Sequence, residues 1–179
     1  MNTRFLCSIV LVGFAVASQV AAAADGTIAF NGNVTAQTCT INGNGSNARD
    51  FTVTLPTVSS SSLAAAGQTA GRTPFGISLT ACTPATGNVH TYFEPGPTVN
   101  LQTGHLILKT GGATNVEIGL QNGDFSDIKA GAADASQNSK PVAITTGSAT
   151  LNYYAQYVAT GAATAGAANS TVMYTLSYQ

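Results

Sequence analysis

Residues 24–41 read ADGTIAFNGNVTAQTCTI, and this stretch decides the fold. Its apolar and small residues recur at every second position: Ile28, Phe30, Gly32 and Val34. This period of two is typical of a β-strand, although strands usually have only about five or six residues. The length therefore predicts two parts, an outer one at 26–33 and an inner one at 34–41, which carries Cys39.

The rest of the chain repeats the period of two in short runs separated by turn residues. These runs cover residues 51–55, 74–82, 89–93, 99–101, 105–109, 115–121, 142–145, 151–158 and 171–178. Asn122-Gly123 is a strong hairpin signal, and residues 57–73 form a Ser/Ala/Gly/Thr-rich connector with one helical turn at 63–66. Many short strands with frequent turns indicate an all-β, immunoglobulin-like sandwich. The last run ends at the chain terminus, which suggests a final strand with an unfilled neighbour.

Charge is scarce in this chain. Only 7% of its residues are charged, against about 25% in an ordinary soluble domain. Six Lys and Arg against seven Asp and Glu leave no basic face for phosphates, so nucleic acid is not an expected partner. The 44% hydrophobic content argues against a disordered chain. A surface this weakly charged is better suited to an assembling subunit than to a free monomer.

The first residues predict export. A short positive start is followed by an apolar stretch at 5–17 and by small residues at 21–23, which is the pattern of a secretory signal peptide. Cleavage near Ala24 removes Cys7 and leaves Cys39 and Cys82. Two cysteines in an exported protein most simply form one disulfide, and zinc ligation is the weaker alternative.

The two ends and the cysteines carry a resemblance to a known family. The sequence resembles the type 1 family of fimbrial (pilin) subunits, which Gram-negative bacteria assemble by the chaperone/usher route. The matching features are Phe30-Asn31-Gly32 with Val34, Thr38-Cys39, Cys82 at the end of FGISLTAC, YYAQYVAT at 153–160, Gly166 fourteenth from the end, and the penultimate Tyr178.

That resemblance implies an incomplete immunoglobulin-like sandwich that lacks its last strand. A periplasmic chaperone first fills the resulting groove, and a donor strand from a neighbouring subunit then replaces it. The implied organisation is a signal peptide at 1–23, a donor-strand extension at 24–33 and a pilin domain at 34–179. The implied donor residues are Ile28, Phe30, Gly32 and Val34, of which Val34 lies at the changeover into the domain's own first strand. The implied groove and chaperone-recognition residues are Gly166, Val172, Tyr174, Leu176, Tyr178 and Gln179, the last through its carboxylate.

The expected function is therefore structural. The resemblance implies a fimbrial subunit that polymerises by donor-strand exchange and supports cell adhesion or biofilm formation. Its expected partners are other pilin subunits, a periplasmic chaperone and an outer-membrane usher, and its location is the surface fimbrium after transit through the periplasm. The alternative is a secreted β-sandwich module that binds a host or glycan ligand through loops such as 83–88 or 123–139.

Catalytic and metal sites are not expected. His90 and Glu94 lie four positions apart in a strand, too far for proton transfer, and His90 and His105 are predicted to be surface residues. Asp124 and Asp127 flank a turn, where short acids commonly bond nearby backbone, and they fall short of a calcium cage. No enzyme activity, metal or cofactor is therefore predicted.

Overall fold

The computed structural model describes residues 27–29, 34 and 36–179. The chain divides into two units, Met1–Val34 and Thr35–Gln179. Within the described residues, no helix has the length and apolar character needed to cross a membrane. The second unit carries all the strands of the described structure.

Most of the predicted N-terminal features fall outside the described residues. These are the predicted signal peptide at 1–23 and the donor residues Phe30 and Gly32. The other two donor residues, Ile28 and Val34, are described and are 79% and 99% exposed. Neither side chain is buried within its own unit.

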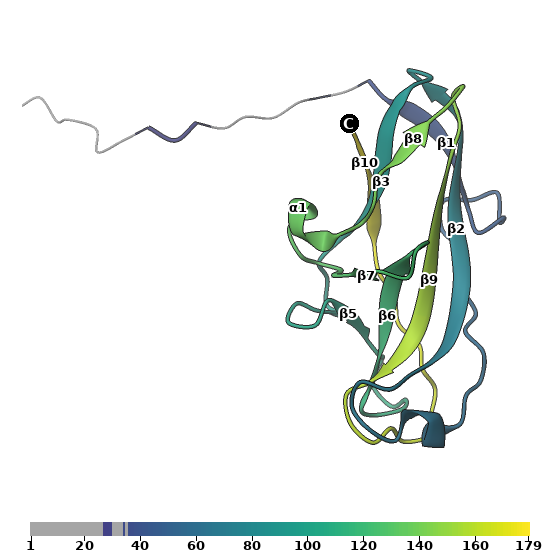
Figure 1. The fold of residues 1–179 in the computed structure, drawn as a ribbon, viewed down its shortest axis with the longest axis vertical. Helices are drawn as coiled ribbons and strands as arrows, with labels where there is room; N and C mark the ends of the chain where they lie inside the picture. Colours follow the sequence, from purple (N-terminus) through teal and green to yellow (C-terminus); the bar gives the residue numbers. More distant parts are fainter. Residues whose placement is uncertain (1–26, 30–33, 35) are drawn as a thin grey trace, which may run out of the picture. The chain divides into compact units, whose positions relative to one another are not determined.

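The larger sheet of the second unit has seven antiparallel strands (Figure 1). Their order across the sheet is β1-β2-β9-β6-β5-β4, and β7 pairs with β6. The bounds are β1 Thr38–Gly43, β2 Thr69–Thr83, β4 Val99–Asn100, β5 His105–Ile107, β6 Val116–Asn122, β7 Asp127–Ile128 and β9 Ala149–Ala159. The predicted runs at 74–82 and 151–158 thus become the neighbouring long strands β2 and β9.

The smaller sheet has three strands in the order β10-β3-β8. Its strands are β3 Gly87–Phe93, β8 Val142–Ile144 and β10 Tyr174–Tyr178. Two short helices complete the described elements, a 3-10 helix η1 at Ser60–Leu63 and α1 at Asp134–Gln137. No sequence pattern indicated α1, because four residues are too few to show a helical period.

The core lies between the two sheets, as expected for a sandwich. On β9, Leu151, Tyr153 and Ala155 are buried while Thr150 and Asn152 are exposed, which is the predicted alternation. Phe93 of β3 meets Tyr153 edge to face, with ring centroids 5.5 Å apart. Side chains from the two inner faces therefore pack against each other.

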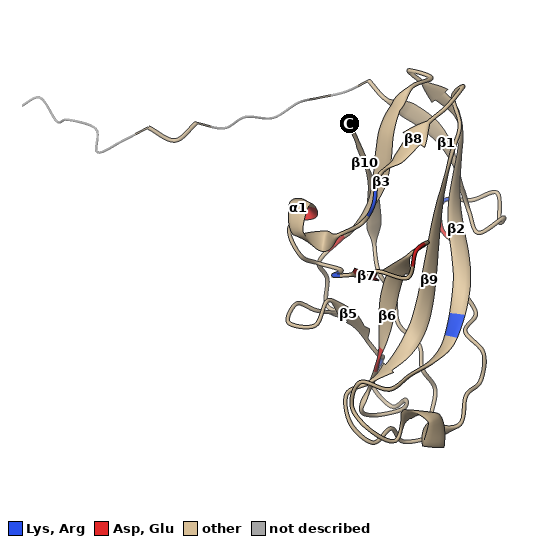
Figure 2. Cartoon of the chain, viewed as in Figure 1, with Lys and Arg blue, Asp and Glu red and all other residues tan. Residues whose placement is uncertain are grey.

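Charged residues are few and scattered along the ribbon (Figure 2). Arg72 is the only charged residue of β2, and β1 and β9 have none. The outer face of the larger sheet is therefore covered mainly by hydroxyl, amide and small side chains.

Two predictions for the segment after β1 need correction. Residues 51–55 were expected to form a strand, but they are extended and pair with no strand in the described structure. The helical turn lies at Ser60–Leu63 instead of 63–66, and β2 already begins at Thr69. Residues 51–55 have no partner strand among the described residues because they border a groove.

Candidate functional site: a groove between two unpaired edges

One edge of the groove is the strand β10. It pairs only with β3, and Gln179 and Asn88 exchange both backbone hydrogen bonds, at 2.8 and 2.9 Å. In an antiparallel pair, alternate residues turn their N–H and C=O groups toward the partner. The backbone groups of Tyr174, Leu176 and Tyr178 therefore point away from β3, and they have no partner among the described residues.

The opposite edge is the extended segment at 51–58. Phe51, Val53 and Leu55 are half-buried and pack on the core, whereas Thr52 and Thr54 between them are exposed. No backbone hydrogen bond joins this segment to a neighbouring strand in the described part of the chain. It has the side-chain pattern of a strand without the hydrogen bonds of one.

Two hollows lie between these two edges, and a third lies between the end of segment 51–58 and residues 163–168. The first, of about 600 Å³, is lined by Ile41, Phe51, Val172, Tyr174, Leu176 and Tyr178, among others. The second, of about 270 Å³, shares Phe51, Val172 and Tyr174 with the first and reaches the core residues Phe93, Ile118 and Leu120. The third, of about 330 Å³, is lined by Val58, Leu63 and the segment 163–168. Together these hollows form what we call the groove, and its floor is the hydrophobic core.

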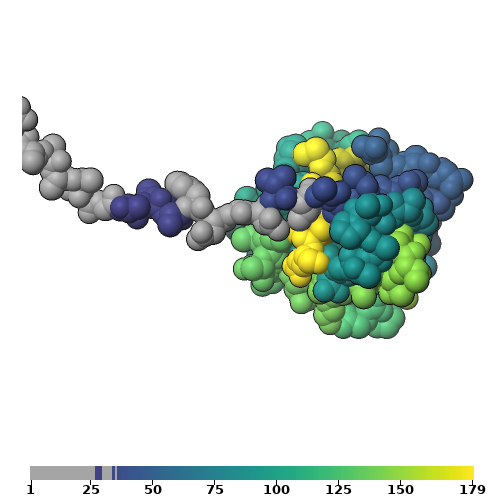
Figure 3. All heavy atoms as spheres, turned by 90° about the horizontal axis from the view of Figure 1, so that it is seen from above, coloured from purple at the N-terminus to yellow at the C-terminus, as the bar shows by residue number. Residues whose placement is uncertain are grey.

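The groove walls carry apolar and aromatic side chains, and Arg49 and Asp50 also line the first hollow. The rings of Phe51 and Tyr174 meet edge to face with centroids 6.1 Å apart, and the Tyr174 hydroxyl donates to the Arg49 carbonyl at 2.7 Å. Burial raises the pKa of both Tyr174 and Tyr178 above the ordinary tyrosine value. The lining phenols are therefore neutral at physiological pH. Figure 3 shows the end of β10, in yellow, at the surface.

Gly166 lies where the groove leaves no room for a side chain. A Cβ atom there would lie 2.5 Å from the Ala113 backbone nitrogen and 2.8 Å from the Gly112 carbonyl carbon. The Ala113 amide donates to the Ala167 carbonyl at 2.8 Å, so the two segments are held at this close approach. Only glycine fits this position without a backbone shift.

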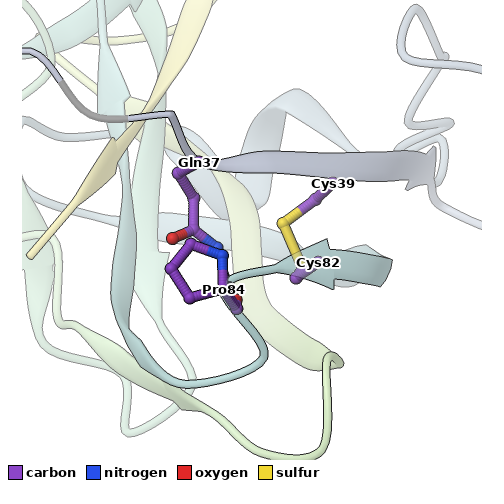
Figure 4. Close-up of a disulfide and its surroundings, with 4 residues drawn as sticks. All are labelled: Gln37, Cys39, Cys82 and Pro84. Atoms are coloured by element: carbon purple, nitrogen blue, oxygen red, sulfur yellow. Dashed lines mark hydrogen bonds between the residues drawn. A yellow bond between two sulfur atoms is a disulfide. The ribbon is translucent and has the colours of Figure 1, made fainter.

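A disulfide fixes the start of the second unit (Figure 4). It joins Cys39 of β1 to Cys82 of β2, which confirms the predicted pairing. Beside it, the Gln37 side-chain amide donates to the Pro84 carbonyl at 3.0 Å. Gln37, which immediately precedes Thr38 of β1, is thus tied to the residue that follows β2.

The structure gathers several of the sequence-predicted site residues and leaves others apart. Val172, Tyr174, Leu176 and Tyr178 line the groove, and Gly166 lines its far end. Gln179 continues the pairing with β3. Sequence reasoning missed the facing wall: Ile41, Phe51, Val53, Leu55 and Val58. The alternation in FTVTL was the available signal, but it was interpreted as an ordinary strand.

The prediction for His90 was wrong. His90 is only 4% exposed, and its Nε2 atom lies 2.7 Å from an Asp134 carboxylate oxygen. The unpredicted helix α1 supplies that carboxylate, and Ser177 of β10 also donates to it, at 3.4 Å. His105 is half-buried, 3.2 Å from Glu117, instead of free on the surface. Both pairs hold neighbouring elements together.

The turn acid Asp124 has local partners. Asp124 accepts from the Ser126 amide at 3.2 Å and from its hydroxyl at 2.7 Å, which is the predicted turn role. The Lys140 ammonium and the Ser126 donors hold the pKa of Asp124 well below its usual range. No group of three or more His, Cys, Asp or Glu side chains converges on one point in residues 27–29, 34 and 36–179.

Fold and groove together define a class of protein: an all-β subunit whose sandwich lacks a strand between β10 and the segment 51–58. A sequence model of the type-1 fimbrial protein A family (FimA) matches residues 55–179. The chain belongs to this family.

Known fimbrial subunits are similar in sequence to nearly the whole of this chain. The major fimbrial subunit SMF-1 of Stenotrophomonas maltophilia is 54% identical over 170 residues, covering 92% of this chain and 98% of the relative. The F17 fimbrial protein of Escherichia coli is 48% identical, covering 92% and 93%. The chain is therefore a structural fimbrial subunit and not an enzyme.

Solved structures show the same fold. A type I fimbria protein of Burkholderia pseudomallei superposes with a TM-score of 0.57 at 28% identity, covering 79% of this chain and 99% of that one. A chaperone-usher pilus subunit gives 0.60 at 23% identity, with 90% and 100% covered. The fold is the incomplete immunoglobulin-like sandwich of pilins. As a pilin, the chain polymerises with other subunits into a fimbrium at the cell surface.

Proposed function

We propose that the extension at residues 24–33 of one subunit, together with Val34 at the changeover into the pilin domain, fills the groove of the next as a donor strand, with Ile28, Phe30, Gly32 and Val34 facing the groove floor. The observation that carries this proposal is the pair of unpaired edges on either side of an apolar groove. Strand addition to an exposed edge is a general mode of recognition, in which backbone hydrogen bonds give affinity and pockets for alternate side chains give specificity.

The energetics support this arrangement. Each apolar donor side chain that leaves water contributes about 1.5–3 kcal/mol. Tyr174, Leu176 and Tyr178 offer their free backbone N–H and C=O groups, and each new hydrogen bond contributes roughly 0.5–1.5 kcal/mol. These gains are comparable with the stability of a whole domain, about 5–15 kcal/mol. The inserted strand would therefore act as part of the fold.

Glycine in the donor strand has a defined role in this proposal. Ile28, Phe30 and Val34 bring side chains to the groove, whereas Gly32 on the same face brings none. Backbone can then approach backbone closely at that point.

The same groove indicates that the subunit needs assembly factors before it polymerises. Its floor is the core, and an exposed apolar edge is prone to aggregation. We therefore propose that a periplasmic chaperone covers the groove and contacts β10 and Gln179. An outer-membrane usher then accepts the complex. The signal peptide at 1–23 would deliver the chain to the periplasm, and the finished fimbrium would support adhesion or biofilm formation.

Deletion of residues 24–33 tests the proposal. The deleted subunit should still be captured by the chaperone through its groove but should give no heat-sensitive ladder of multimers on unboiled gels. A variant with the same residues in scrambled order is the matched control for length and composition, and it should fail in the same way. Ladders that persist after the deletion would refute donor-strand insertion.

A further inference from the structure

A second surface of this subunit lies on the outer face of the larger sheet, away from the groove. It consists of Arg72 on β2, Gln121 on β6, Tyr154 and Gln156 on β9, and Phe125 in the β6–β7 turn, and is called the outer-face patch below. We propose that the outer-face patch binds an acidic saccharide. None of these residues lines the groove.

Phe125 occupies a position where a bulky residue is unfavourable. Its amide donates to the Asn122 carbonyl at 3.0 Å, and the Asn122 amide donates to the Ser126 carbonyl at 2.9 Å, so residues 123–125 form a three-residue hairpin loop. The last position of such a loop takes the left-handed conformation and normally holds glycine. Phe125 adopts it with φ +66°, and its side chain is still 49% exposed. The strain is not offset by burial in the core.

The exposed ring instead builds an aromatic surface. The ring centroids of Phe125 and Tyr154 are 4.9 Å apart, and the Arg72 guanidinium carbon lies 4.7 Å from the Phe125 centroid. Rings presented in this way can pack on the apolar face of a sugar ring. The exposed Phe125 ring and the half-buried Tyr154 ring come from different elements and form one aromatic surface.

The charge in the outer-face patch is positive and lacks an acidic partner. Arg72 donates to the Gln156 side-chain oxygen at 3.2 Å and forms no salt bridge with any described residue. A guanidinium that keeps further N–H donors free is suited to a carboxylate or sulfate. Of the nearby acids, Asp124 pairs with Lys140, whereas Asp127 keeps its charge and accepts a hydrogen bond from the neutral Gln121 amide at 2.9 Å.

Polar groups for hydroxyls lie beside the rings. Gln121 is opposite Tyr154 in the ladder and only 5% exposed, and its Oε1 atom has no hydrogen-bond partner among the described residues. Next to Tyr154, a shallow hollow of about 510 Å³ is lined by Asn44, Gly76 and Asn152, among others. That volume falls in the range of small-molecule sites, about 300–1,000 Å³. Amide side chains, aromatic faces and one guanidinium together suit a saccharide better than an apolar protein surface.

Repetition would make a weak site effective. Each subunit of the fimbrium carries one outer-face patch, so a polyvalent glycan surface can engage many at once. Linked sites of this kind raise overall avidity by about 10²–10⁴ without new contacts. A shallow patch is therefore sufficient on a polymer.

The test uses fimbriae purified from cells that express the full chain. Binding is measured to surfaces coated with sialyllactose, a heparin-derived oligosaccharide or neutral lactose. We expect binding to sialyllactose or heparin at least tenfold above lactose, and the comparison of the two identifies carboxylate or sulfate as the recognised anion. Equal binding to all three surfaces, or none, would overturn the proposal.

Variants separate recognition from folding. Phe125→Gly should relieve the turn and leave fimbrial yield unchanged, yet reduce acidic-glycan binding at least tenfold, while Phe125→Tyr should retain it. Arg72→Gln should reduce binding similarly, and Lys109→Gln, which removes an exposed positive charge elsewhere, should not. Unchanged binding by Phe125→Gly or Arg72→Gln would overturn the proposal. Loss of fimbrial yield or stability without loss of binding would assign the patch to contacts between subunits.

Discussion

Gly43 and Phe51 offer the sharpest test of how the groove wall is built. Phe51 is the residue of segment 51–58 that lines both the first and the second hollow. A Cβ atom on Gly43 would lie 1.9 Å from Cδ1 and 2.6 Å from Cε1 of the Phe51 ring. Gly43→Ala therefore cannot be accommodated unless the ring leaves its place, and the groove between the ring and Tyr174 is then disturbed.

The expected magnitude follows from overpacking. Inserting a methyl group against a fixed neighbour costs typically about 1–3 kcal/mol. Because the displaced ring also disturbs the wall that a donor strand must contact, fimbrial assembly should fall as well as stability. Phe51→Ala removes the obstacle, so the double variant should be less impaired than the sum of the two single variants, by roughly 0.5–3 kcal/mol.

The assay compares fimbrial yield and the guanidinium midpoint of depolymerisation for the parent, both single variants and the double variant. Gly96→Ala is the matched control, because no atom lies within 4 Å of the added Cβ. Gly43→Ala should lower both quantities while Gly96→Ala changes neither. Equal behaviour of the two glycine variants, or strict additivity in the double variant, would refute the assignment of Phe51 as a groove wall.

Three further predictions follow from the same geometry. Gly32→Asn should prevent polymerisation while chaperone capture persists, measured by gel ladders and co-purification; normal ladders would contradict a close backbone approach. Replacing Cys39 and Cys82 by alanine opens a loop with a sequence separation of 43 residues and should destabilise the subunit by about 4 kcal/mol, seen as lost periplasmic yield; an unchanged yield would contradict it. Because burial raises the folded-state pKa of Tyr174 and Tyr178, their stabilising contribution is present below the unfolded pKa of about 10 and is lost as the pH rises through the folded value. Depolymerisation should therefore accelerate above that pH, and less so when both tyrosines are phenylalanine; a pH profile identical in the double variant would contradict this.

The sequence predicted those features of the fold that require a recognisable residue pattern, such as the alternation of a half-buried strand. Period-two alternation located β2, β9 and β10, since inward and outward residues must alternate in a half-buried strand. The two cysteines left after the leader identified the disulfide. Gly166 could be flagged only by its distance from the end; the reason it must be glycine, the backbone of Ala113 at 2.5 Å, is a tertiary contact.

What the sequence could not provide came from contacts between distant segments. The burial of His90 depends on α1, which is 44 residues away and too short to show a period. The outer-face patch likewise depends on a bulge in β2 and a turn after β6 that bring Arg72 and Phe125 together. Neither residue stands out in its local sequence, because its neighbours in space are not its neighbours in the chain.

Segment 51–55 has the side-chain pattern of a strand, as predicted, but not, among the described residues, the hydrogen-bonded partner that a strand needs. FTVTL alternates as a strand does, and its Phe, Val and Leu side chains do pack on the core. Yet no backbone–backbone hydrogen bond joins it to a strand in the described chain, and the outer edge of β10 across the groove has none either. Buried backbone groups are normally paired, so two facing edges that both lack partners require one further strand. A chain with more strand pattern than its own fold can pair is specified for completion by another molecule, and the proposed donor extension at 24–33 has the alternation that such a strand needs.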